Sequence, residues 1–310
     1  MRDILYFADN FAHWRGGAHF AARLVAWQDG TLTGAFVYPS PLATMPPVIA
    51  PDVLSVVMES SRELERKALA AGPGFAAWAM GERVERSLWQ VAEGYTPDVL
   101  AHLGNWHDAL VLERGDGAWT SPAALGQLVL MSRLPTFLVA ADAVLPERLG
   151  CVCLAWNGAA EALRAIHAAL PLLTQAERVV LLQGPLRASY AEGGWRPAFD
   201  IGAYFRRHDL SVERHALEGS DDEAGAALLA ACQAQGAELL VMGAYGHTRL
   251  REWVFGGATR HVLHHATNPN LGPLSSPSGS RPISPETRSR TRRSGATSAP
   301  ATAMSRSSCR

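Results

Sequence analysis

Three glycines near the end of the chain have a spacing that could place backbone amides around an anion. Gly243, Gly246 and Gly256 follow the pattern G-x2-G-x9-G, between an apolar run and an amphipathic segment. Glycine lets the backbone approach a ligand closely, and backbone N–H groups ahead of a helix bind phosphate groups. The other interpretation is that these glycines, with Gly257, only permit a tight turn and close packing of a helix on a sheet. The spacing leaves both interpretations open.

The elements around this segment predict how the glycines are positioned. Apolar or alternating runs at residues 149–156, 178–184, 210–219 and 238–244 are typical of strands, and the segments between them have helical spacing. Alternating strands and helices predict a parallel, doubly wound α/β sheet, in which ligands bind beyond the carboxyl ends of the strands. Ser220 and Glu223 form a capping-box pattern for one of these helices. Asn157 and Gly243 both stand at predicted carboxyl ends, which favours a site there.

The first 145 residues repeat this plan more weakly. We predict strands and helices in the same alternation, with Ser121 capping a helix that has Pro122 at its first position. The predicted strands are residues 3–9, 30–39, 108–115 and 136–142, and the predicted helices are residues 13–26, 55–71, 75–92 and 121–135. An internal duplication of about 140 residues describes both halves. The first half lacks the three-glycine spacing, so we expect no nucleotide site there.

Composition excludes several classes of protein. The 310 residues suit two domains, and the net charge of −1 gives no general attraction to nucleic acid or anionic membranes. No apolar run reaches the roughly 20 residues that span a bilayer, and the four cysteines have neither disulfide-scaffold nor metal-ligand spacing. Known catalytic motifs are missing from the sequence, so we expect no catalytic residue and no metal site. A reduced, cytoplasmic setting is the expectation.

The residues around the glycines resemble a known family. MGAYGHTRLREWVFGGATRHVL resembles the phosphate loop and last helix of universal stress proteins, and LAWNGAAEALRAI is similar to their first strand, turn and helix. The likeness covers residues 149–267 well and 1–145 weakly, as in tandem two-domain members. It implies two doubly wound, Rossmann-like α/β domains with parallel sheets. Residues 1–145 would form a degenerate domain, 146–270 the domain with the glycine motif, and 271–310 a disordered Ser/Pro/Arg-rich tail.

The same resemblance implies that the second domain binds ATP, with Mg. By position in the family motif, Met242 and Gly243 would lie near the ribose and adenine, and Gly246 and Gly256 near the phosphates. Asn157 matches the place of an Asp that addresses the adenine end in the family. The helix after the glycines would add a favourable partial positive charge at its N-terminus.

Two positions depart from the family pattern. The third glycine is normally followed by a Ser or Thr that donates to a phosphate, whereas here Gly257 follows it and Thr259 is the nearest hydroxyl. Asn157 also replaces a charged acceptor with an amide. We expect a cytoplasmic stress-response protein with regulatory nucleotide binding rather than catalysis. The alternatives are a nucleotide-independent dimerisation or partner-binding protein of the same fold and, third, a slow ATP hydrolase.

The tail departs most from the family. In similar proteins a short apolar strand closes each domain, and two such strands pair across a two-fold interface, in a homodimer or between domains of one chain. Here residues 268–310 contain seven Arg and one acidic residue in a Ser/Pro-rich composition that does not order itself. We interpret the tail as the product of a frameshift near residue 268; a basic tail for nucleic acid or anionic lipid is the rival interpretation. We therefore expect the closing strand to be lost and the edge at residues 135–140 to be exposed.

Overall fold

The two halves of the chain contain the same kinds of element in alternation. The computed structural model describes residues 1–46, 48–114, 121–143, 146–184, 200–217, 223–243, 257–265 and 272–275. Residues 1–279 form one compact unit. The predicted capping residue Ser220 and the predicted disordered tail beyond residue 275 lie outside the described residues. None of the described helices is long and apolar enough to cross a bilayer.

The first half begins with a strand whose residues are buried from the second onward, as its continuous apolar run predicts. Its strands are β1 (Asp3–Ala8), β2 (Thr31–Tyr38), β3 (Ser87–Glu93), β4 (Ala109–Arg114) and β5 (Thr136–Ala140). Its helices are α1 (Gly16–Gln28), α2 (Pro41–Thr44), α3 (Pro51–Ala70), α4 (Gly72–Gly81), α5 (Thr96–Gly104) and α6 (Pro122–Ser132). The predicted cap of α6 is confirmed, because the Ser121 hydroxyl accepts from the amide of Ala124 at 3.2 Å.

The second half contains the elements that its sequence predicts and one strand, Gly272–Ser275, that was not expected. Its strands are β6 (Cys151–Trp156), β7 (Arg178–Gln183), β8 (Val212–Ala216), β9 (Leu239–Val241) and β10 (Gly272–Ser275). Its helices are α7 (Ala160–Leu173), α8 (Ile201–Arg207), α9 (Ala224–Ala234) and α10 (Gly257–His265).

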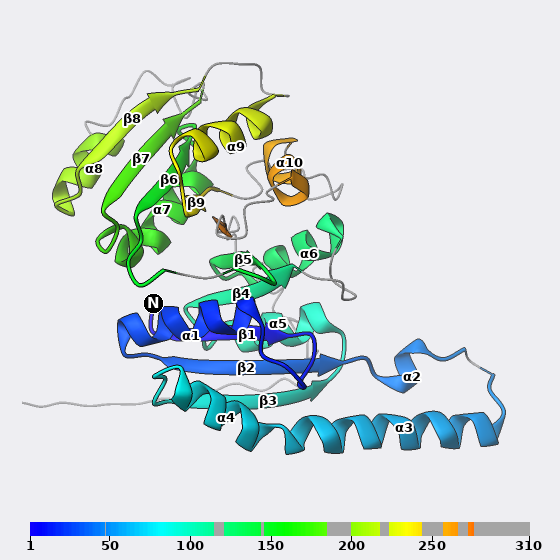
Figure 1. Cartoon of the computed structure of the whole chain (residues 1–310). Coiled ribbons are helices and arrows are strands. Elements are labelled where there is room, and N and C mark those ends of the chain that lie inside the picture. Colours follow the sequence, from blue (N-terminus) through cyan, green and yellow to red (C-terminus); the bar gives the residue numbers. More distant parts are fainter. Residues whose placement is uncertain are drawn as a thin grey trace, which may run out of the picture. The chain divides into compact units, whose positions relative to one another are not determined.

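All the described strands belong to one sheet, with the order β3-β2-β1-β4-β5-β10-β9-β6-β7-β8 (Figure 1). Every neighbouring pair is parallel except β5 and β10, which are antiparallel. The five strands of each half therefore have the same relative order. In each half the order changes direction beside the first strand, between β1 and β4 and between β6 and β9. The predicted doubly wound parallel α/β fold is confirmed.

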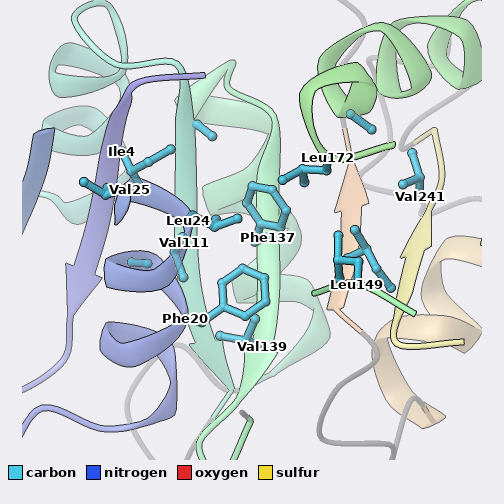
Figure 2. Packing of buried hydrophobic residues seen from close by; sticks show 14 of the residues in the cluster. Ile4, Phe20, Leu24, Val25, Val111, Phe137, Val139, Leu149, Leu172 and Val241 are labelled. Carbon is cyan, nitrogen blue, oxygen red and sulfur yellow. The ribbon is translucent and has the colours of Figure 1, made fainter. Parts of the chain in front are cut away.

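Helices cover both faces of the sheet. Successive residues of a strand point to opposite faces and pack in different hydrophobic clusters. Ile4, Tyr6 and Ala8 of β1 pack with α1 and α4 on one face, while Leu5 and Phe7 pack with α5 and α6 on the other. Figure 2 shows the first face, where Phe20 and Leu24 of α1 lie beside Val111 of β4 and Phe137 of β5. The same alternation determines which face of the sheet each residue near a strand end occupies.

The closing strand of the second half is present, contrary to the sequence prediction. In β10, Leu274 and Ser275 pair with Phe137 and Thr136 of β5, and Gly272 to Leu274 pair with β9. The predicted exposed edge at β5 is therefore wrong. A four-residue strand suffices here because it has a partner on each side, although its sequence, GPLS, has little strand character.

One other prediction in the first half is wrong, and some elements there were not predicted. Residues 75–92 were expected to form one helix, but α4 ends at Gly81 and residues 87–93 form the edge strand β3, which pairs with β2. The helix α5 was not predicted at all. In β3, Trp89 and Val91 face inward in alternation with exposed Leu88 and Gln90. This alternation is short and lies in a segment rich in helix-forming residues, so it is a weak sequence signal for a strand.

Candidate functional site

The candidate site lies where β6 and β9 end side by side. The two strands pair in parallel, with Leu154 opposite Val241, so their carboxyl ends meet at the same edge of the sheet. Asn157 follows β6, and Met242 with Gly243 follow β9. Three of the predicted site residues are therefore brought to one place, beside the change in strand order at which ligands bind in α/β sheets.

Gly243 lies against the first turn of α7. A methyl group built at Gly243 would come within 2.6 Å of the backbone nitrogen of Ala162 and 2.7 Å of the carbonyl carbon of Glu161. Real Cβ atoms do not approach backbone atoms this closely, so only glycine fits at this position without movement of the helix or the strand. The N-terminus of α7 and the end of β9 are thus in direct backbone contact.

Asn157 shapes the turn that leads into α7. Its Oδ1 accepts a hydrogen bond from the amide of Ala159 at 3.1 Å, and Gly158 between them has a φ of 82°. This is the usual turn-forming geometry of an asparagine, and glycine adopts the left-handed conformation without strain. The side-chain oxygen is therefore used locally, which leaves the Nδ2 amide of Asn157 as the group that could address a ligand.

The remaining described site residues belong to the core or to α10. Met242 is buried and packs in a cluster with Val262 of α10, so its backbone rather than its side chain would face a ligand. Gly257 opens α10, and a methyl group built there would meet no atom of the described residues within 4 Å. Thr259, in the same turn, is buried with 9% of its surface exposed. Gly246 and Gly256 lie outside the described residues.

The other end of α10 contacts the first half of the chain. Leu263 packs in the cluster that contains Leu125 and Leu128 of α6. Its carbonyl oxygen accepts a hydrogen bond from Nη1 of Arg114, at the end of β4, at 3.4 Å. A cation near the C-terminal end of a helix is favourable, because the last carbonyl groups carry a partial negative charge.

Three cysteines of the second half are buried. Cys151, Cys153 and Cys232 pack together on the face that α9 covers. Burial raises the pKa of the Cys151 thiol, and a hydrogen bond with Cys232, followed by burial, raises the pKa of Cys153. Neutral buried thiols are poor nucleophiles and metal ligands. Among the described residues, no group of three or more His, Cys, Asp or Glu side chains could hold a metal ion.

Sequence reasoning missed two acidic residues of the first half. Asp9 follows β1 and Glu113 lies near the end of β4, which pairs with β1 as β9 pairs with β6. Comparing DILYFAD with CVCLAWN position by position would have shown that Asp9 corresponds to Asn157. Comparing DALVLE with ELLVMG in the same way would have shown that Glu113 corresponds to Gly243.

Comparisons with known proteins agree with this architecture. The model of the universal stress protein family matches residues 152–271, which include β6, β9, α10 and the three-glycine segment. This segment is similar to a universal stress protein domain. The predicted resemblance is confirmed.

Solved universal stress proteins share the fold over most of the chain. A universal stress protein from Archaeoglobus fulgidus DSM 4304 is 11% identical, with a TM-score of 0.60, and the match covers 89% of this chain and 97% of that one. A putative universal stress protein from Pseudomonas aeruginosa UCBPP-PA14 is 14% identical, with a TM-score of 0.51 and coverage of 89% and 93%. At these identities the likeness concerns the fold alone. No curated protein matches the sequence.

Proposed function

We propose that the protein is a cytoplasmic stress-response protein whose second half binds an adenine nucleotide, ATP with Mg, as a regulatory ligand. The observation that carries the proposal is the direct backbone contact between Gly243 and the first turn of α7. Because residue 243 is glycine, the chain has no side chain directly after β9. This position lies beside Asn157, in the segment that matches the family. Such a position allows a ligand to approach the backbone and the start of a helix.

The roles of individual residues follow from this arrangement. The backbone at Met242 and Gly243 would contact the nucleoside, and Nδ2 of Asn157 would donate to it, since Oδ1 is engaged in the turn. The glycine segment that ends at Gly256, with Gly257 and Thr259 after it, would lie along the phosphates. We assign no catalytic residue, so binding rather than hydrolysis is the proposed activity.

A partner-binding protein that does not use nucleotide is the second candidate. Two observations favour it: close packing of a helix on a strand is by itself a reason for glycine at Gly243, and Gly257 brings no hydroxyl to the start of α10. In both candidates we propose a two-domain arrangement in which the pairing of β5 with β10 joins the halves within one chain.

The identity of any bound nucleotide decides between the two candidates. Protein purified without added nucleotide would be denatured, and the released small molecules identified by mass spectrometry. We expect adenine nucleotide in the wild type and a rise in melting temperature with ATP and Mg. Gly246→Val should abolish both, because it removes the second glycine of the motif. Lack of nucleotide together with no thermal shift would reject the proposal in favour of the partner-binding candidate. Phosphate release above background, lost in Gly246→Val, would instead indicate slow hydrolysis.

A matched pair of substitutions at Gly257 tests the phosphate end of the site. Gly257→Ser adds the hydroxyl that the family normally has, and Gly257→Ala adds only a methyl group, which would have no atom of the described part of the chain within 4 Å. A hydrogen bond to a charged group contributes about 1.5 kcal/mol or more, so we expect Gly257→Ser to bind ATP roughly tenfold more tightly. Gly257→Ala should bind like the wild type. Equal affinities of all three proteins would contradict the placement of phosphates at the start of α10.

A further inference from the structure

Strand register makes Glu113 of the first half the counterpart of Gly243. In the first half Tyr6 of β1 lies opposite Val111 of β4, and in the second half Leu154 lies opposite Val241. All four side chains point to the same face of the sheet, in one hydrophobic cluster. Two residues further along β4 is Glu113, and two residues further after β9 is Gly243. The same counting pairs Asp9 with Asn157.

The Glu113 carboxylate binds the N-terminus of α1. Its Oε2 accepts a hydrogen bond from the amide of Gly17, the second residue of α1, at 2.9 Å. A methyl group built at Gly17 would come within 2.9 Å of the same oxygen and 3.1 Å of the Tyr6 ring. The helix amide, the carboxylate and the ring are thus closely packed, and the free N–H groups of a helix start are the usual binding place of an anion.

At the corresponding strand end the second half has Gly243 in place of a carboxylate, and the acidic residue there, Glu161, belongs to the first turn of α7 itself. There Gly243 meets the first turn of α7 directly, at Ala162. The two halves therefore differ at the strand end, where the first half has the side chain of Glu113 and the second half has no side chain. This difference would not be visible from the missing glycine spacing alone.

The surroundings of Glu113 hold the carboxyl group in place. It is half-buried, and within the described residues its Oε1 is buried without a hydrogen-bond partner. Burial raises the pKa of Glu113, and the charge of Asp9 raises it further, while the Gly17 amide and the charge of Arg15 oppose the rise. The buried Tyr6 hydroxyl also lies beside Glu113. Burial raises the pKa of Tyr6, and the charge of Glu113 raises it further.

We propose that Glu113 is a built-in anion that occupies, in the first half, the place at the helix N-terminus where a ligand anion could otherwise bind. The end of β4, which corresponds to the nucleoside end of the site proposed for the second half, is therefore closed to a ligand by the chain's own side chain. Nucleotide binding by the second half rests on the proposed function above. The position of Glu113 at the N-terminus of α1 does not rest on it.

Hydrogen exchange at two neighbouring glycines tests the contact. In 15N-glycine-labelled protein, the Gly17 amide should exchange at least about tenfold faster in Glu113→Ala than in the wild type, since its acceptor is lost. The Gly16 amide donates to the carbonyl oxygen of Ala141 at 2.9 Å and serves as the internal reference. Glu113→Gln, which keeps a side-chain oxygen, should give an intermediate rate, and Glu85→Gln at an exposed site should give the wild-type rate. An unchanged ratio of Gly17 to Gly16 exchange in Glu113→Ala would overturn the proposal.

Photolabelling of the full chain tests the closure. With a photoreactive ATP analogue, we expect labelled peptides from the second half alone. Labelling of peptides around Asp9 to Gly17, competed by ATP, would overturn the proposal, because the first half would then be open. No specific labelling anywhere would reject nucleotide binding by the second half, and the exchange rates at Gly17 would still decide the role of Glu113.

Discussion

Replacing Gly243 with alanine would place a methyl group inside the first turn of α7. The new Cβ would lie 2.6 Å from the backbone nitrogen of Ala162 and 2.7 Å from the carbonyl carbon of Glu161. Both neighbours are backbone atoms, so neither can swing away as a flexible side chain could. The start of α7 or the end of β9 would have to shift, and overpacking of this kind costs about 1–3 kcal/mol.

The assay is unfolding by urea and by heat. A loss of 1 kcal/mol lowers the melting temperature by roughly 2–4 °C in a domain of this size, so we expect a decrease of about 3–10 °C for Gly243→Ala. Gly257→Ala is the matched control, because its methyl group meets none of the described atoms within 4 Å; it should be neutral or stabilise α10 by up to about 1 kcal/mol. If Gly243→Ala unfolds at the same urea concentration as the wild type, the close backbone contact at this position is wrong.

Three further predictions concern other parts of the chain. A protein ending at residue 279 should melt like the full chain, whereas one ending at residue 271 loses β10 and should melt lower and aggregate, because β5 and β9 lose their shared partner; equal melting temperatures would contradict the central position of β10. Arg114→Met should lower the free energy of unfolding by about 1 kcal/mol, since the Leu263 carbonyl loses a charged donor, while Arg62→Met at an exposed site should not. Because the folded state raises the pKa of Glu113, it holds that proton more tightly than the unfolded state does. The stability of the wild type relative to Glu113→Gln should therefore rise as pH falls from the raised pKa toward the ordinary pKa of glutamate, and urea titrations that show the opposite slope would refute the assignment.

The second half was predictable because its elements have strong periodicity. The apolar run at β6 and the helical spacing of α7 indicate their types without tertiary information. The edge strand β3 and the closing strand β10 were not predictable in this way. β3 is only partly buried, and β10 contains Pro273, which lacks the amide that a central strand normally donates. Both strands depend on their neighbours in the sheet.

The candidate site was predictable only in part, for a similar reason. Asn157 and Gly243 could be named because each directly follows an apolar run, and the fold confirms that these runs end side by side. The use of the Asn157 oxygen in the turn and the packing of Met242 under α10 needed the coordinates. Alignment of DALVLE with ELLVMG gives Glu113 the position of Gly243, but the hydrogen bond from the Gly17 amide to Glu113 needed the coordinates.

The antiparallel pairing of β5 with β10 lies within a single polypeptide, which has a consequence for how the two halves can diverge. In a symmetric homodimer one gene encodes both subunits, so a substitution at one site appears at both. A covalent link removes this constraint and also keeps the partners at a high effective concentration, so even a four-residue strand can hold the contact. The second half can then keep glycine at the end of β9, while the first half has Glu113 at the equivalent position of β4.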